Sequence, residues 1–139
     1  MPVVSELIRI EDDGTISFGN YMLAAKSKLQ DFEFQGDLYK VKTFGEITKL
    51  ERNGMFVYES VPGTAVHGFK ADENDVTFVV EGPENASITL ELEPETEYKV
   101  HVDDVYVGKN KTNLGGKMSI SVDLEEGRPV KVDVKRAFD

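Results

Sequence analysis

The fold is decided most clearly by residues 118–124, which read Met118-Ser119-Ile120-Ser121-Val122-Asp123-Leu124. Apolar and polar side chains alternate at every position, and successive side chains of a β-strand point to opposite faces. One face of this segment is therefore apolar, as in a strand that covers a core on one side and meets solvent on the other. Residues 88–92, 98–102 and 130–134 repeat the pattern. The sequence predicts four half-buried strands in its second half.

Shorter apolar stretches extend this prediction toward the N-terminus. Candidate strands occupy residues 7–10, 15–18, 21–25, 31–34, 38–44, 47–50, 55–59 and 76–80. Asn53-Gly54, between two of them, is a strong hairpin signal because both residues tolerate positive φ. Residues 21–30 contain helix-forming side chains but no apolar stripe of helical period, so a helix there is the weaker interpretation. We therefore expect an all-β protein.

Turn signals that recur about every 8 to 12 residues favour a sandwich or a barrel. The sequence places a domain boundary at Pro62-Gly63, because lysine- and phenylalanine-bearing strands precede it and valine-rich, acidic strands follow. We expect residues 63–139 to form an immunoglobulin-like antiparallel β-sandwich. Residues 1–62 are expected to add an N-terminal β-meander or small subdomain, since about 60 residues are marginal as a separate domain. One continuous domain is the alternative.

Composition narrows the classes of partner. The chain has 16 Lys and Arg residues against 26 Asp and Glu, a formal net charge of −10, which repels nucleic-acid backbones and anionic membranes. The absence of cysteine excludes disulfides and thiolate metal sites. No stretch approaches the roughly 18 apolar residues of a membrane span, and no apolar leader follows Met1. These observations predict a mature cytoplasmic protein, or a fragment whose targeting segment was removed, without nucleic-acid or membrane partners.

Two family resemblances rest on particular runs of sequence. Residues 97–108, followed by 109–113, 116–122 and 130–134, resemble the strand-turn-strand cadence of bacterial immunoglobulin-like modules, which implies an accessory or array-forming domain. The runs Gly36-Asp37-Leu38-Tyr39-Lys40-Val41-Lys42-Thr43 and Tyr58-Glu59-Ser60-Val61-Pro62-Gly63-Thr64 are similar to small bacterial proteins labelled endosialidase. This second resemblance implies a function on carbohydrate. The Asp-box of sialidases ends in Trp, and the chain has none.

Catalytic and metal-binding patterns are weak. Ser60, His67 and Asp72 follow the residue types of a nucleophile, base and orienting acid, but no Gly-x-Ser-x-Gly motif accompanies them, so a turn and a surface histidine are expected. The acidic stretch 72–75 and the pair Asp12-Asp13 lack EF-hand spacing. The sequence predicts no cofactor and no metal.

Candidate binding residues are aromatic. Phe56 and Tyr58 alternate with Met55 and Val57, so this strand is apolar on both faces. We expect a second sheet to cover one face and another subunit to cover the other. An exposed aromatic platform for a sugar would draw on three tyrosines, Tyr21, Tyr39 and Tyr106.

A stripe of lysines in the first half suits an acidic partner, such as the chain's own acidic second half, or guards a sheet edge. It comprises Lys26, Lys28, Lys40, Lys42 and Lys49. The function predicted from the sequence is a non-catalytic interaction or assembly module that forms homo-oligomers or binds a protein. A carbohydrate-binding accessory module is the alternative, and a sialidase-like glycoside hydrolase has less support.

Overall fold

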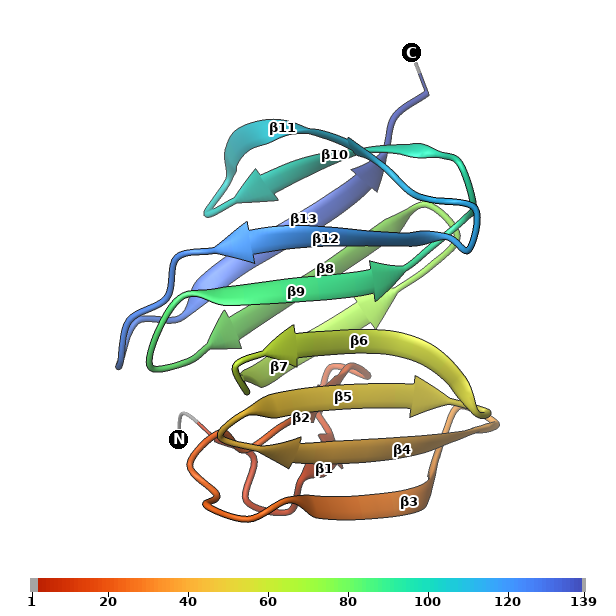
Figure 1. The fold of residues 1–139 in the computed structure, drawn as a ribbon. Helices are drawn as coiled ribbons and strands as arrows, with labels where there is room; N and C mark the ends of the chain where they lie inside the picture. The colour runs from red at the N-terminus through yellow and green to blue at the C-terminus, as the bar shows by residue number, and fades with distance from the viewer. Residues whose placement is uncertain (1–2, 139) are drawn as a thin grey trace.

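The computed structural model describes residues 3–138 and shows strands without helices in that range (Figure 1). Accordingly, no described segment is a helix long and apolar enough to cross a membrane. The strands are β1 (Ile8–Ile10), β2 (Ile16–Phe18), β3 (Ser27–Phe34), β4 (Asp37–Phe44), β5 (Ile47–Arg52), β6 (Met55–Val61), β7 (Ala65–Ala71), β8 (Asp75–Glu81), β9 (Ala86–Glu91), β10 (Glu97–Val102), β11 (Val105–Lys111), β12 (Lys117–Val122) and β13 (Val130–Arg136).

The strands form two antiparallel sheets. The seven-stranded sheet has the order β1-β2-β7-β8-β13-β10-β11, and the six-stranded sheet has the order β12-β9-β6-β5-β4-β3. The two sheets are seen one behind the other in Figure 1. Alternating burial along β12, in which Met118, Ile120 and Val122 are buried, shows the inward face that the sequence predicts. The prediction of an all-β sandwich is confirmed.

Both sheets combine strands from either side of Pro62. Strand β2 pairs with β7, and β6 pairs with β9. One apolar core includes residues from Ile8 to Val134. Near its centre, the Tyr58 ring meets Phe18 and Phe78 edge to face, at centroid distances of 5.2 and 5.7 Å. The division into an N-terminal meander or subdomain at 1–62 and a sandwich at 63–139 stays a prediction.

The expected strand at residues 21–25 is wrong, as is the alternative helix at 21–30. Residues 21–25 form turns and bends, and strand β3 begins only at Ser27. The Asn20 side chain accepts a hydrogen bond from the backbone N–H of Met22 at 3.0 Å, and the Asn20 carbonyl accepts one from Leu23 at 3.5 Å. These local bonds use the backbone groups that a strand ladder would need.

Candidate functional site

Strand β11 forms an exposed edge of the seven-stranded sheet. It pairs with β10 on one side and has no strand on its other side among the described residues. Its first three residues, Val105, Tyr106 and Val107, are 61%, 53% and 59% exposed. Because an edge strand presents unpaired backbone groups, apolar side chains beside them make a surface suited to another polypeptide.

The turn that leads into β11 is fixed to the sheet. Asp103 and Asp104 both have positive φ, 50° and 65°, as a two-residue hairpin turn of the primed type requires. The backbone N–H of Lys131 donates to the Asp103 carboxylate at 2.9 Å, and the Lys131 ammonium donates to Asp104 at 3.3 Å. The latter hydrogen bond raises the pKa of Lys131. These contacts hold the hairpin tip against β13.

A β-bulge explains why three consecutive apolar residues are all exposed. Val100 pairs with Gly108 and His101 pairs with Tyr106, so Val107 is the extra residue on β11. An extra residue interrupts the alternation of side chains between the two faces. The His101 ring lies 5.5 Å from the Tyr106 ring, and its Nδ1 has no hydrogen-bond partner among the described residues.

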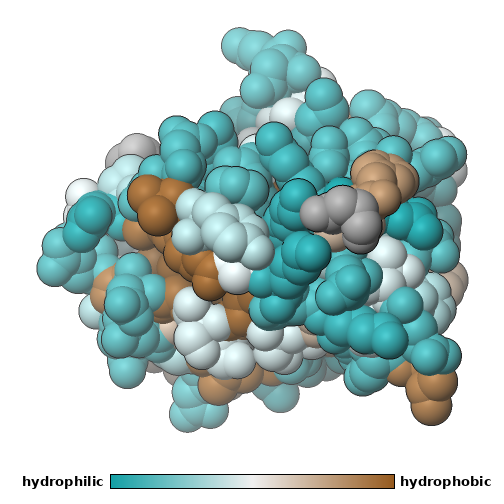
Figure 2. Space-filling model, turned by 90° about the horizontal axis from the view of Figure 1, so that it is seen from above, coloured by the Kyte–Doolittle hydropathy of each residue, from teal (hydrophilic) through white to brown (hydrophobic). Residues whose placement is uncertain are grey.

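A groove of about 260 Å³ separates β11 from the edge strand β12 of the other sheet. Apolar and polar side chains both line it, namely Val100, Val102, Val107, Asn110, Ser119, Ile120 and Ser121. The Asn110 side chain of β11 donates to the Ser119 carbonyl of β12 at 3.4 Å across this groove. Figure 2, which looks down on the β10 and β11 side, shows hydrophobic surface gathered toward one side of a largely hydrophilic face.

A larger cleft of about 470 Å³ opens at one end of the sandwich. It lies where the β5–β6 turn, the β7–β8 turn and the end of β9 meet, over apolar side chains that include Phe69 and Leu90. Its rim carries Asp72, Glu73, Asp75, Glu91 and Glu93. Backbone N–H groups of Asn74 and Asp75 donate to the Asp72 carboxylate and lower its pKa. Asp72 therefore stabilises its own turn.

The structure separates the two aromatic residues predicted on β6. Tyr58 is fully buried, and its burial raises the pKa of its hydroxyl. Phe56 is half-buried on the outer face, where the ammonium groups of Lys49 and Lys117 lie 5.8 and 4.5 Å from the ring centroid. Strand β6 is flanked by β5 and β9. Tyr58 thus belongs to the core, and lysine side chains lie over Phe56.

Two of the three predicted platform tyrosines are buried. The Tyr21 hydroxyl donates to Glu126 at 3.3 Å, and burial, with this acidic neighbour, raises the pKa of Tyr21 to about 12. Tyr39 packs edge to face with Phe34, with ring centroids 5.9 Å apart. Neither Tyr21 nor Tyr39 forms part of an exposed platform, because Tyr39 is buried in the sandwich core and Tyr21 is buried in a small cluster with Val3 and Ala65. Tyr106 is the predicted tyrosine that is exposed.

Ser60, His67 and Asp72 have separate partners. The Ser60 hydroxyl is buried and hydrogen-bonds to Thr64 at 2.8 Å, while His67 Nε2 lies 3.0 Å from Glu81. Asp72 binds the backbone of its own turn. Within residues 3–138, no group of three or more His, Asp or Glu side chains is arranged to hold a metal ion.

Sequence reasoning identified Tyr106 but missed its neighbours Val105 and Val107. The available signal was three consecutive apolar residues directly after the acidic turn, where a half-buried strand would alternate. Comparison of the chain with protein-family models, with curated proteins and with solved structures gave no match. The resemblances to immunoglobulin-like modules and to proteins labelled endosialidase therefore stay predictions.

Proposed function

We propose that this protein is a non-catalytic β-sandwich interaction module that self-associates through the edge strand β11. The observation that carries the proposal is the exposed run of Val105, Tyr106 and Val107 beside unpaired backbone groups. Large apolar side chains grouped on a surface commonly mark protein contacts. The immunoglobulin-like type of residues 63–139 and the N-terminal meander at 1–62 belong to the same proposal, as does a cytoplasmic location.

The proposed occupant of this edge is β11 of a second copy. Acidic Asp103 and Asp104 precede the apolar run, and basic Lys109 and Lys111 follow it. When two β11 strands lie antiparallel across a two-fold axis, the acidic end of each faces the basic end of the other. The apolar residues then meet at the centre. The strand is thus self-complementary in both charge and hydrophobicity.

The extent of the surface sets the expected affinity. Stable interfaces bury about 800 Å² on each partner, and three exposed residues supply only part of such an area. The bulge at Val107 also limits how far a regular ladder can extend. We therefore expect weak, reversible dimerisation, with a dissociation constant on the order of 10 to 100 µM.

Sedimentation velocity across about 1 to 200 µM protein tests this proposal. The wild type is expected to shift from monomer toward dimer. Val107→Lys should remove the shift, because it places two ammonium groups at the centre of the two-fold contact. Met55→Lys is the matched control, since Met55 is similarly exposed but is the first residue of β6 in the other sheet. A wild type that stays monomeric, or equal losses in both variants, would contradict the proposal.

Carbohydrate binding is the second candidate, because Tyr106 is exposed and a second aromatic ring, His101, lies beside it. An aromatic face can stack on a sugar ring. A glycan array with the wild type and Tyr106→Ala is the test. Glycans bound by the wild type and not by the variant would favour carbohydrate binding, and an array without bound glycans would exclude this candidate function.

A further inference from the structure

The outer face of the six-stranded sheet gathers four lysines, Lys28, Lys40, Lys42 and Lys49, which we call the lysine cluster. In the strand register, Lys28 of β3 pairs with Lys42 of β4, and Lys42 pairs with Lys49 of β5. Lys40 lies two residues from Lys42 on the same face of β4. Neighbouring strands are about 4.8 Å apart, and next-nearest residues of one strand are about 6.7 Å apart. Four ammonium-bearing side chains therefore leave the sheet from adjoining positions.

This arrangement brings together charges that repel. Like charges directly opposite one another destabilise a pair of strands. The Lys49 ammonium lies 3.7 Å from Glu51. Lys28, Lys40 and Lys42 form no ion pair with any acidic residue in the described part of the chain. Glu51, which lies opposite Lys40 in the strand register, is thus the carboxylate paired with the cluster, and three of the four ammonium groups have no ion pair among the described residues.

The four side chains enclose a shallow hollow. It has a volume of about 100 Å³ and is lined by the lysine cluster and Glu51. Lys40, Lys42 and Lys49 are half-buried, so their aliphatic stems pack along the sheet while their charged ends reach solvent. This packing limits the freedom of the ammonium groups before any ligand arrives.

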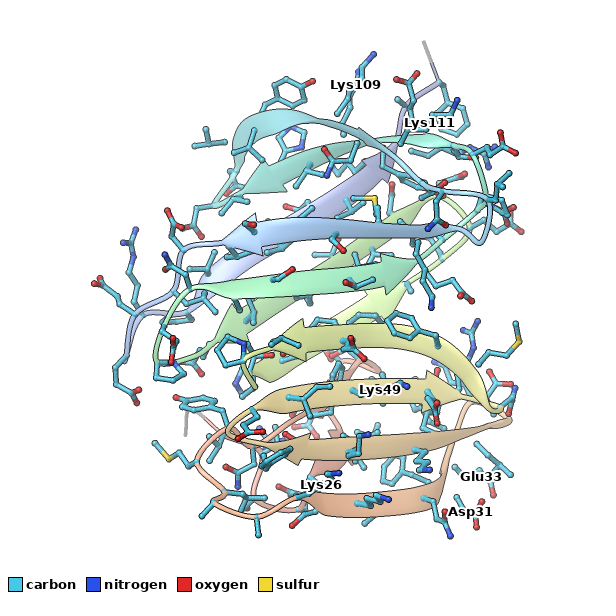
Figure 3. All side chains as sticks on the ribbon, viewed as in Figure 1. Lys26, Asp31, Glu33, Lys49, Lys109 and Lys111 are labelled. Carbon is cyan, nitrogen blue, oxygen red and sulfur yellow. The ribbon has the colours of Figure 1, made fainter. Side chains whose placement is uncertain are left out.

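Acidic residues surround the cluster. Glu59 follows Lys49 in the same cross-strand row, on β6. Asp31 and Glu33 lie toward the far end of β3, away from Lys49 and Lys26, as Figure 3 shows. A long anionic polymer laid across this face would run from the lysines onto these carboxylates. A small anion would stay within the hollow.

We propose that the lysine cluster binds a compact polyanion that carries three or more negative charges on phosphate, sulfate or carboxylate groups. Lysine ammonium groups act as point charges and do not impose the two-point geometry of arginine, so the site recognises the number and closeness of charges. The ligand relieves the repulsion that folding creates. Its binding should therefore stabilise the folded protein.

Isothermal titration calorimetry with inorganic tripolyphosphate at low salt tests the proposal. Lys40→Gln/Lys42→Gln is expected to weaken binding by about tenfold or more. The matched control is Lys70→Gln/Lys135→Gln, which removes the same charge from exposed positions on β7 and β13 of the seven-stranded sheet. The control should stay within about twofold of the wild type. The unliganded Lys40→Gln/Lys42→Gln protein should melt at a higher temperature, which also shows that it folds.

Several outcomes would overturn the proposal. The first is that the wild type does not bind tripolyphosphate at low salt. The second is that the two double variants weaken binding equally, which would indicate general charge attraction. Tighter binding of an acidic peptide or an anionic polysaccharide than of tripolyphosphate would assign the face to a polymer. Salt-sensitive self-association that disappears in Lys40→Gln/Lys42→Gln would assign it to a second copy. Inorganic phosphate, sulfate and citrate, titrated in parallel, distinguish the chemical sources, and phosphate is expected to bind more weakly than tripolyphosphate.

Discussion

The replacement Thr64→Val tests a group of buried hydroxyls at the connection from β6 to β7, where the chain passes from the six-stranded to the seven-stranded sheet. The Thr64 hydroxyl hydrogen-bonds to the Tyr58 hydroxyl and to the Ser60 hydroxyl, each at 2.8 Å, and all three residues are fully buried. The Thr64 backbone N–H and carbonyl both bond to Thr48 Oγ1, at 3.1 and 2.8 Å, and valine keeps these two contacts. Valine has nearly the shape of threonine. The substitution therefore removes one hydroxyl and little else.

The expected loss of unfolding free energy follows from what remains unpaired. Each lost hydrogen bond costs about 1 kcal/mol, and a buried polar group without a partner costs about 1 to 3 kcal/mol. The Tyr58 and Ser60 hydroxyls both lose their Thr64 partner. We expect Thr64→Val to cost about 2 kcal/mol. Such a loss is a large fraction of the stability of a typical domain, which is about 5 to 15 kcal/mol.

Urea unfolding of Thr64→Val, Tyr58→Phe and the double variant measures this cost and its origin. Tyr58→Phe alone should cost about 1 kcal/mol. The double variant should cost less than the sum by about 0.5 to 1 kcal/mol, because Tyr58→Phe removes the hydroxyl that Thr64→Val leaves unpaired. Thr64→Ser, which keeps the hydroxyl, is the control. A Thr64→Val protein within about 0.5 kcal/mol of the wild type, or strictly additive losses, would refute the reasoning.

Two further predictions concern a close backbone approach at Gly63 and the hydrogen bond between Ser17 and Glu11. A Cβ at Gly63 would collide with the Phe44 carbonyl oxygen, so Gly63→Ala should lower the unfolding free energy, measured in urea, by more than about 2 kcal/mol. Gly54 lies in open space at φ 77°, and Gly54→Ala should cost about 1 kcal/mol. Equal losses in the two variants would contradict the predicted collision. The Ser17 hydroxyl donates to Glu11 and is the main cause of the lowered pKa of Glu11, whose ordinary value is 4.5. Because the folded pKa is depressed, this stabilisation is present above about pH 4.5 and is lost as the pH falls through the folded pKa. Ser17→Ala should thus narrow the difference in stability between about pH 7 and pH 3, and an unchanged difference in urea titrations would exclude this linkage.

Much of the fold follows from local pattern. Ile120 and Val122 alternate with serines, and they are buried in the structure as the alternation predicts. Asn53-Gly54 forms the hairpin turn between β5 and β6, with φ of 51° and 77°. Residues 21–25 failed as a strand because the Asn20 side chain offers their backbone other hydrogen bonds. The alternation of apolar residues could not reveal that competition.

The candidate site was predicted less completely, for a related reason. Tyr39 and Tyr106 both lie on strands, yet Tyr39 is buried in the core and Tyr106 is exposed, because their directions depend on which sheet face each strand buries. Tyr21 lies in a turn and is buried beside Val3 and Ala65. Three consecutive apolar residues break the expected alternation, but the bulge that exposes Val107 depends on how β11 pairs with β10.

The sequence by itself determined that this chain forms strands, where many of its turns lie and which side chains of the late strands face a core, because these properties depend on residues a few positions apart. Only the tertiary structure decided which strands lie at the edges and which lysines meet across β3, β4 and β5. Strand order and register join residues far apart in the chain, and hydrophobic burial, which drives that assembly, has no preferred direction. The same alternating pattern is compatible with many sheet orders.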